Sequence, residues 1–410
     1  MKHESMNRYI SMMCVVGLLS LLLTGCALFR EKPPEVKDTG LTKLAPSEYP
    51  EFSDDLAYDR LAEGILGSIS YLRRVPPDRT FRFGQDVYET SHMIRSLEHF
   101  LQFIQATPSN KELKEYIQTN YRVYRSVGGD TPGEVLFTGY YEPVLKGSLE
   151  PGPEYSFPIY ARPDDLTTID LSLFSPQFKG KKIIGRYTHN SVVPYYDRKD
   201  IEYKEILKEK AETIAWLNDR VDLFFLHIQG SGKIELSSGE TLHVHYHTTN
   251  GRPYRSIGKF LIDQGKISKA EMSMQKIRDY LSRHPEEVDT VLHYNPSYVF
   301  FKIEEDGPLG YLEVRLTPGR SIAMDRRLFP LAGLGFIETQ KPLPTDTGEI
   351  DRWTDFSRFV LYQDTGGAIR GPGRADLFWG NGRQAEIAAG HMKHPGSLYF
   401  LILKPDKSSA

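Results

Sequence analysis

Three stretches after residue 50 repeat apolar residues every three or four positions, and this spacing predicts amphipathic helices. The first helix is expected soon after Ser53 and Asp54, and the second over residues 87–104. The third follows a capping box formed by Ser109 and Glu112. The expected apolar faces are Leu61, Ile65, Ile69 and Leu72 in the first helix, Ile94, Leu97, Leu101 and Ile104 in the second, and Leu113, Tyr116 and Ile117 in the third.

From residue 134 onward, short runs rich in β-branched and aromatic residues predict strands. A proline at 143 suggests that the first strand ends there or lies at a sheet edge. Everything after residue 312 is predicted to be all-β, so the chain is expected to be mainly β with helices (α+β). The expected strands cover 135–143, 221–228, 241–247, 298–303 and 359–362, and the expected helices cover 201–217, 256–263 and 270–283, the last behind a capping box of Ser268 and Glu271.

The N-terminal segment combines a basic start with an apolar run over residues 11–23, which is short for a membrane span. It ends in Leu-Thr-Gly followed by Cys26, which resembles the lipobox of bacterial lipoproteins. We therefore expect a signal peptide over 1–25 and lipidation of Cys26. Ala27 resembles a signal for outer-membrane sorting. Residues 26–50, rich in Pro, Lys and Glu, are expected to form a flexible tether.

Composition narrows the class of protein only a little. The 410 residues carry a formal net charge of −3, which gives no electrostatic case for binding nucleic acid. Only two cysteines occur, at 14 and 26, so no disulfide or cysteine metal site is expected in the folded part. The chain has 24 Tyr and 21 Phe. Aromatic rings of this number serve either as core residues or as stacking faces for sugars.

The stretch 358–380 holds the most suggestive chemistry. A buried strand is expected to run into Asp364 and then into Gly366 and Gly367, where glycine permits a sharp turn or a close ligand. Asp376 follows, just before Leu-Phe-Trp at 377–379. Two carboxylates at strand ends beside aromatic residues can form a catalytic cleft. They can equally bond turn amides, as aspartate often does, and the stretch alone leaves both readings open.

Three tempting motifs predict no cofactor. Gly-Ser-Gly-Lys at 230–233 lacks the glycine at 227 and the Ser or Thr at 234 that a phosphate loop needs. His243, His245 and His247 share one strand face, but their positions extend in a line and do not wrap around an ion. Asp-Thr-Gly occurs at 346 and 364, too close together for the two lobes of an aspartic protease.

An ordered set of segments resembles the membrane-bound lytic murein transglycosylase A family. The C-terminal part looks like that family's three-aspartate domain, with acids at Asp325, Asp364 and Asp376. The lipobox agrees with this resemblance. The matching segments are 137–144, 229–232, 254–259, 272–275, 295–301 and 364–371.

The resemblance implies a fold of two parts with the substrate cleft between them. One part is a six-stranded double-psi β-barrel built from residues 51–143, which include the N-terminal helices, and residues 307–405. The other is a β-rich domain inserted over 144–306. Loops at strand ends on such a rigid scaffold are where binding groups tend to lie.

The resemblance also implies cleavage of the β-1,4 bond between N-acetylmuramic acid and N-acetylglucosamine in peptidoglycan, without water, during cell-wall turnover. Asp376 would be the general acid and then the base, with Leu377, Phe378 and Trp379 expected to raise its pKa. Asp364 would either stabilise the charged transition state or only order the glycine turn, and Asp325 would be structural. Expected sugar contacts are Thr138, Tyr140, Tyr141, Gln229, Ser231, Gly366 and Gly367.

Two other functions stay open at this point. A non-catalytic glycan-binding lipoprotein would use the same aromatic cleft, and a hydrolytic muramidase would use Asp364 as its second carboxylate. In each case the expected partners are peptidoglycan strands, the membrane through Cys26, and other cell-wall enzymes. The expected location is the outer membrane, facing the periplasm. No metal or other cofactor is expected.

Overall fold

The structure is a computed structural model that describes residues 40–204, 206–305, 307–345 and 349–405. The expected signal peptide, the cysteine at 26 and most of the expected tether lie outside these residues. Within the described ranges, no helix is long and apolar enough to cross a lipid bilayer.

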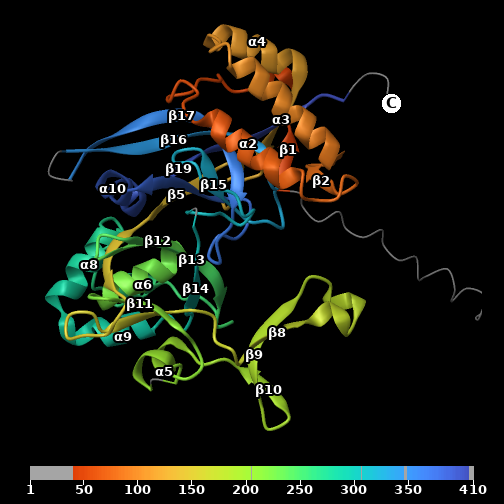
Figure 1. Ribbon diagram of the computed structural model, residues 1–410. Coiled ribbons are helices and arrows are strands. Elements are labelled where there is room, and N and C mark those ends of the chain that lie inside the picture. The colour runs from red at the N-terminus through yellow and green to blue at the C-terminus, as the bar shows by residue number, and fades with distance from the viewer. Residues whose placement is uncertain (1–39, 205, 306, 346–348, 406–410) are drawn as a thin grey trace, which may run out of the picture. The chain divides into compact units, whose positions relative to one another are not determined.

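Six strands close into a barrel, as predicted (Figure 1). The hydrogen-bonded order is β5-β18-β15-β17-β16-β19, and β19 pairs back with β5 to complete the ring. The β5–β18 and β15–β17 pairs are parallel and the other four are antiparallel. The strands are β5 Val135–Glu142, β15 Ser321–Ala323, β16 Leu334–Pro344, β17 Ile350–Asp364, β18 Arg374–Asn381 and β19 Lys393–Leu403.

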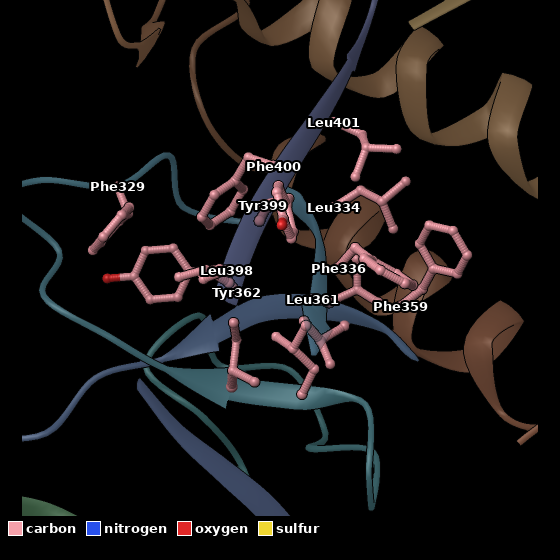
Figure 2. Packing of buried hydrophobic residues seen from close by; sticks show 14 of the residues in the cluster. Phe329, Leu334, Phe336, Phe359, Leu361, Tyr362, Leu398, Tyr399, Phe400 and Leu401 are labelled. Atoms are coloured by element: carbon pink, nitrogen blue, oxygen red, sulfur yellow. The ribbon is translucent and has the colours of Figure 1, made fainter. Parts of the chain in front are cut away.

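The apolar run at the end of β17 is buried on both faces. Residues 359–362 are all fully buried, which agrees with a continuous apolar run and not an alternating one. The ring of Phe359 lies 5.0 Å from that of Phe336 on β16 and 4.9 Å from that of Phe100 (Figure 2). On the same side, the side chain of Leu361 approaches the backbone of Gly64. Helices therefore cover one side of β17 while the barrel interior covers the other.

The three N-terminal helices form as predicted, with corrected starts. The first begins at Leu61, because Asp54 instead accepts hydrogen bonds from the turn amides of Leu56 and Tyr58. The second begins at Thr90, since residues 86–89 form a hairpin strand with 80–83. The capping box of Ser109 and Glu112 is present in the third. The elements are α2 Leu61–Leu72, α3 Thr90–Ile104, α4 Asn110–Asn120, β2 Thr80–Phe83 and β3 Asp86–Glu89.

The end of the segment expected to be a tether is instead folded. β1, Leu41–Lys43, pairs with β4, Tyr121–Ser126, which in turn pairs with β19 of the barrel. The side chain of Leu41 is buried in the main core. The expectation of a flexible chain up to residue 50 is therefore wrong from Leu41 onward.

Two further sheets are built from the middle of the chain. A six-stranded sheet has the order β14-β13-β12-β6-β11-β7, and a three-stranded sheet has the order β10-β9-β8. The strands are β6 Val144–Ser148, β7 Phe157–Tyr160, β8 Leu166–Asp170, β9 Lys182–Thr188, β10 Ser191–Pro194, β11 Thr213–Leu217, β12 Ser231–Leu236, β13 Thr241–Thr249 and β14 Val299–Ile303. The helices are α5 Arg198–Tyr203, α6 Arg220–Gln229, α7 Ile257–Asp263, α8 Met274–Arg283 and α9 Val288–His293, and α10 Arg383–His391 belongs to the C-terminal part.

Four secondary-structure predictions are wrong. Residues 221–228 form helix α6 and not a strand, because Asp219 caps the helix start and Gly230 ends it in the left-handed conformation. Residues 201–217 divide between α5 and β11. The capping box of Ser268 and Glu271 closes only a turn, and α8 starts later, behind Ser273. Helix α10 interrupts the C-terminal part that was expected to be all-β.

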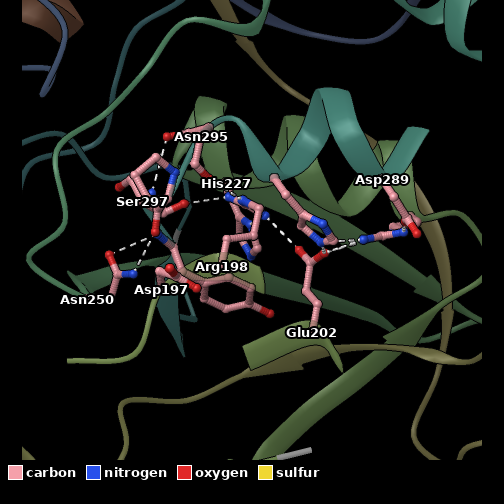
Figure 3. Close-up of polar contacts among 12 residues, drawn as sticks. Asp197, Arg198, Glu202, His227, Asn250, Asp289, Asn295 and Ser297 are labelled. Atoms are coloured by element: carbon pink, nitrogen blue, oxygen red, sulfur yellow. Dashed lines mark hydrogen bonds and ion pairs between the residues drawn. The ribbon is translucent and has the colours of Figure 1, made fainter. Parts of the chain in front are cut away.

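A buried ion-pair cluster joins α5, α6 and α9 (Figure 3). We call Arg198, Glu202, Arg220 and His293 the Glu202 cluster. The guanidinium of Arg198 donates to Oε1 of Glu202 at 2.9 Å, and that of Arg220 donates to Oε2 at 2.7 Å. His293 lies 3.0 Å from the same Oε2. Both carboxylate oxygens therefore have cationic or ring-nitrogen partners, as a buried charge requires.

Candidate active site

The two aspartates of the 358–380 stretch lie on neighbouring parts of one barrel face. In β15, Ala323 pairs with Asp364 of β17 on one side and with Asp376 of β18 on the other. Asp376 in turn pairs with Thr138 of β5. Residues directly opposite on paired strands share a face, and each strand step is about 4.8 Å. The acid pair, Asp364 and Asp376, is therefore separated by roughly 10 Å of backbone.

One carboxylate oxygen of Asp376 is held by two neighbours. The hydroxyl of Thr138 donates to Oδ1, and Nη2 of Arg374 lies 3.3 Å from the same oxygen. Arg374 also donates to the Thr138 hydroxyl at 3.2 Å. Both hydrogen bonds that the Asp376 side chain forms with the described chain end on Oδ1. The side chain is 21% exposed, and Oδ2, which has no hydrogen-bond partner among the described residues, is not one of the buried polar atoms. This oxygen is therefore available to a ligand.

Both carboxylate oxygens of Asp364 are occupied. Oδ2 accepts a hydrogen bond from the hydroxyl of Tyr140 at 2.9 Å. Oδ1 accepts from the backbone N–H of Thr365 at 2.8 Å and of Tyr311 at 2.9 Å. Burial raises the pKa of Asp364 to about 6, with a further contribution from the charge of Asp376 and an opposing one from these three hydrogen bonds. Burial also raises the pKa of Tyr140, so its phenol stays a donor.

The third aspartate is enclosed in a local ion pair. Arg327 donates to both oxygens of Asp325, at 2.9 and 2.6 Å, and the N–H of Gly371 donates at 3.0 Å. Burial alone would raise the pKa of Asp325, but these partners lower it to about 2. The carboxylate is 1% exposed. This geometry supports the structural role expected for Asp325, because both oxygens hold the chain in place.

The surroundings of Asp376 differ from the expected apolar pocket. Leu377 points into the main core, since neighbouring residues of a strand face opposite sides. Phe378 is 1% exposed and packs against the ring of Tyr140, at 5.2 Å between centroids. Trp379 contacts the guanidinium of Arg358 instead. The groups bonded to Asp376 are polar and cationic, and of the three expected apolar neighbours Phe378 alone shares its strand face.

The middle of the chain reaches the barrel through Gln229. Its side-chain oxygen accepts a hydrogen bond from the backbone N–H of Tyr141 at 3.1 Å. Gln229 ends helix α6, so the Gln-Gly-Ser-Gly segment follows a helix and not the strand that was expected. The ring of Tyr141 is 3% exposed and packs among residues of α6, α7 and α8. Ser231 is 7% exposed, so both residues are buried although sugar contacts were expected there.

The two glycines after Asp364 differ in their surroundings. A methyl group on Gly366 would lie 2.9 Å from Ile369, whereas one on Gly367 would meet nothing within 4 Å. Neither has a positive φ, so the turn does not require glycine for its backbone conformation. The open space at Gly367 leaves room for a bound molecule.

Two residues near Asp376, Arg374 and Tyr254, had no role predicted from the sequence. Arg374 is two positions away, on the same strand face, and the distance of 3.3 Å appears only once β18 is built. Tyr254 is 40% exposed and close enough to Asp376 and Arg374 to interact with them electrostatically. It comes from the loop after β13, and no local pattern signals such a long-range approach.

Metal-binding groups do not gather in the described part of the chain: no three His, Cys, Asp or Glu side chains converge there. His243 and His245 lie on β13, opposite Lys233 and Ser231 of β12. Burial and the charge of Lys302 lower the pKa of His245 to about 4.

Two family profiles match the chain. The MltA specific insert domain matches residues 136–302, and the 3D domain matches residues 320–402. The chain therefore combines a closed barrel, this insert, and an acid pair on the barrel face. These features define its class as a 3D-domain protein that carries the MltA specific insert domain.

Two relatives that match about two thirds of the chain share one name. Membrane-bound lytic murein transglycosylase A of Escherichia coli K12 is 34% identical over 281 residues, 68% of each chain. The protein of that name from Vibrio cholerae is 31% identical over 288 residues, 69% of each chain. The chain belongs to the membrane-bound lytic murein transglycosylase A family.

Solved structures agree with this assignment. The membrane-bound lytic murein transglycosylase of Agrobacterium tumefaciens superposes with a TM-score of 0.71 at 30% identity, covering 89% of this chain and 98% of that one. The E. coli MltA structure with bound chitohexaose superposes with a TM-score of 0.68 at 25% identity, covering 91% and 98%.

Proposed function

We propose that this protein is a peptidoglycan lytic transglycosylase. It cleaves the β-1,4 bond between N-acetylmuramic acid and N-acetylglucosamine without water and leaves 1,6-anhydro-N-acetylmuramic acid ends. Family membership supports this proposal, as does the related E. coli structure with bound chitohexaose. The observation that carries it is the open Oδ2 of Asp376 beside an occupied Asp364.

Asp376 performs both proton transfers in this proposal. Its protonated carboxyl donates to the glycosidic oxygen as the bond from that oxygen to C1 breaks. The resulting carboxylate then takes the proton of the sugar's own C6 hydroxyl, whose oxygen attacks C1. Thr138 and Arg374 hold Oδ1, so that Oδ2 keeps one orientation toward the sugar.

Asp364 acts through charge and not through contact. With a pKa of about 6 it is mostly ionised at pH 7, so it stabilises the positive charge that develops on the sugar ring. Its bonds to Thr365 and Tyr311 order the adjacent loop at the same time. A muramidase would need a second carboxylate with a free oxygen to act as nucleophile or base. The occupied oxygens of Asp364 favour the transglycosylase.

Sugar contacts are proposed where polar groups lie near Oδ2. Thr138, Tyr254 and the open space at Gly367 are the first candidates, and Gln229 and Tyr140 hold the two sides of the site in position. A test is the release of soluble fragments from purified peptidoglycan. A non-catalytic glycan-binding protein would release nothing, which would contradict the proposal.

The proposed location follows from the N-terminal segment. We infer a signal peptide over residues 1–25, lipidation of Cys26, a tether that ends before Leu41, and attachment to the outer membrane facing the periplasm. Residues 51–143 and 307–405 would form the barrel part and 144–306 the insert. Labelled fatty acid should be incorporated into the wild-type protein and not into Cys26→Ala. Equal labelling of both would contradict the anchor.

A further inference from the structure

A groove of about 640 Å³ lies where the start of α8, the end of α10 and the first residues of β19 meet. Lys269, Lys276 and Lys393 line it, and none of them forms an ion pair within the described part of the chain. Two acids also line it. Glu271 accepts a hydrogen bond from Ser268, and Asp279 pairs with an arginine of its own helix. A neutral hydroxyl does not cancel the charge of Glu271, so the three lysines (+3) and Glu271 (−1) leave a net charge of +2 without a counter-charge.

Further features of the same groove suit an anionic, partly apolar ligand. The start of α8 contributes the positive end of a ten-residue helix, which favours carboxylates. The rings of Trp353 and His394 lie 3.8 Å apart and give an aromatic wall. Nδ1 of His394 is buried and has no hydrogen-bond partner among the described residues. His391 bonds a backbone carbonyl through Nδ1, so its Nε2 can face a ligand.

The groove begins close to the proposed catalytic acid. Lys393 pairs directly with Thr138, the residue that donates to Asp376. The two strand steps from β18 through β5 to β19 place Lys393 roughly 10 Å from Asp376 along the sheet. An extended peptide of four residues spans about 13 Å. A short peptide attached to a sugar bound at Asp376 is therefore long enough to reach Lys393, the residue where the groove begins.

We propose that this groove binds the acidic peptide carried by the muramic acid residues of peptidoglycan. This inference rests on the proposed function and adds a specificity to it. Carboxylates of the peptide pair with Lys269 and Lys276, and its aliphatic parts lie on the aromatic wall. A glycan strand without peptides has nothing to place there. The enzyme therefore prefers peptide-bearing strands over peptide-free strands.

The test compares two soluble glycan preparations, one with its peptides and one stripped of them by an amidase. Dissociation constants are measured by titration calorimetry with the Asp376→Asn variant, so that turnover does not consume the ligand. Into this background we introduce Lys269→Glu with Lys276→Glu. The matched control reverses two exposed lysines outside the groove, Lys111→Glu with Lys179→Glu.

The groove variant should bind peptide-bearing strands roughly 5- to 10-fold more weakly, because two attractive surface charges become repulsive. Its affinity for peptide-free strands should stay within about twofold of the parent, and the control should change neither value. The difference should shrink at high salt. Equal affinities of the parent for both preparations, or equal weakening on both, would overturn the inference. Failure of the wild-type protein to cleave either preparation would contradict the proposed function separately.

Discussion

The carboxylate of the Glu202 cluster and the two carboxylates of the acid pair differ in how many of their oxygens have hydrogen-bond partners. In the Glu202 cluster, both oxygens of the carboxylate are bound by Arg198, Arg220 and His293. Burial alone would raise the pKa of Glu202, but these partners hold it well below its usual range. In the acid pair of the barrel, both oxygens of Asp364 likewise accept hydrogen bonds, whereas Oδ2 of Asp376 accepts none within the described chain.

The difference separates a structural carboxylate from a reactive one. A carboxylate with hydrogen-bond partners on both oxygens is fixed, and a substrate proton must compete with those partners. A carboxylate anchored through one oxygen is oriented and still available. The Glu202 cluster contains more charged side chains than the acid pair. The free oxygen nevertheless lies in the acid pair, so we assign the chemistry to that pair.

The largest expected effect is on turnover by Asp376→Asn. Asparagine keeps the shape of the side chain and can still contact Thr138, but it cannot deliver a proton to the glycosidic oxygen. General acid–base catalysis contributes about 10²–10⁴-fold, so we expect at least about a 10²-fold loss in the rate of fragment release. Unfolding by denaturant should change by less than about 1 kcal/mol, because the lost ion pair with Arg374 is partly exposed. Near-normal turnover would show that another group is the acid.

The matched substitution Glu202→Gln should lower the stability of the fold and leave turnover almost unchanged. Removing the charge leaves the buried Arg198 and the nearby Arg220 without their shared carboxylate, and loss of one partner from such a pair costs about 3–5 kcal/mol. Denaturant unfolding should show this loss. The molecules that remain folded should release fragments at close to the wild-type rate. A folded variant without activity would contradict the assignment of Glu202 as a structural residue with no part in turnover.

A smaller effect is expected for Asp364→Asn, and it should depend on pH. The folded-state pKa of about 6 lies above the usual value, so the folded protein binds more protons than the unfolded chain between about pH 4 and pH 6. Wild-type stability should therefore fall as pH rises through this window. The variant lacks this contribution, so its stability relative to wild type should improve by roughly 2 kcal/mol from pH 4 to pH 7.

Thermal or denaturant unfolding at both pH values checks this prediction, and a pH-independent difference would contradict the raised pKa. The same variant should retain more turnover than Asp376→Asn, because Asp364 acts on the sugar only through its charge. A greater loss in Asp364→Asn would exchange the roles of the two aspartates.

Local patterns predicted the elements whose signals are local. The helical periodicity of residues 61–72 and the capping box at Ser109 depend on neighbours within four positions, and both are present. The prediction for residues 221–228 was wrong because six of these eight residues are apolar and they show no clear period. Asp219, whose side chain caps the start of this helix, was a usable sequence signal for a helix.

The site could not be assembled from such patterns. Thr138 meets Asp376 across 238 positions of sequence, and Tyr140 meets Asp364 across 224. Asp364 and Asp376 were named from their own stretch, whereas Thr138 and Tyr140 were named only because of the family resemblance, and neither pairing was predicted. The roles of Arg374 and the burial of Tyr141 depend on strand register and packing between distant segments, which residue spacing does not encode.

The most direct test of the account is the mass of the sugars that the wild-type protein releases from purified peptidoglycan. A single acid that returns as base uses the sugar's own C6 hydroxyl as the nucleophile, so no water enters the product. We predict fragments that end in 1,6-anhydro-N-acetylmuramic acid, each lighter by one water than the corresponding hydrolysis product. Fragments with ordinary reducing ends would contradict the mechanism and support a muramidase in its place.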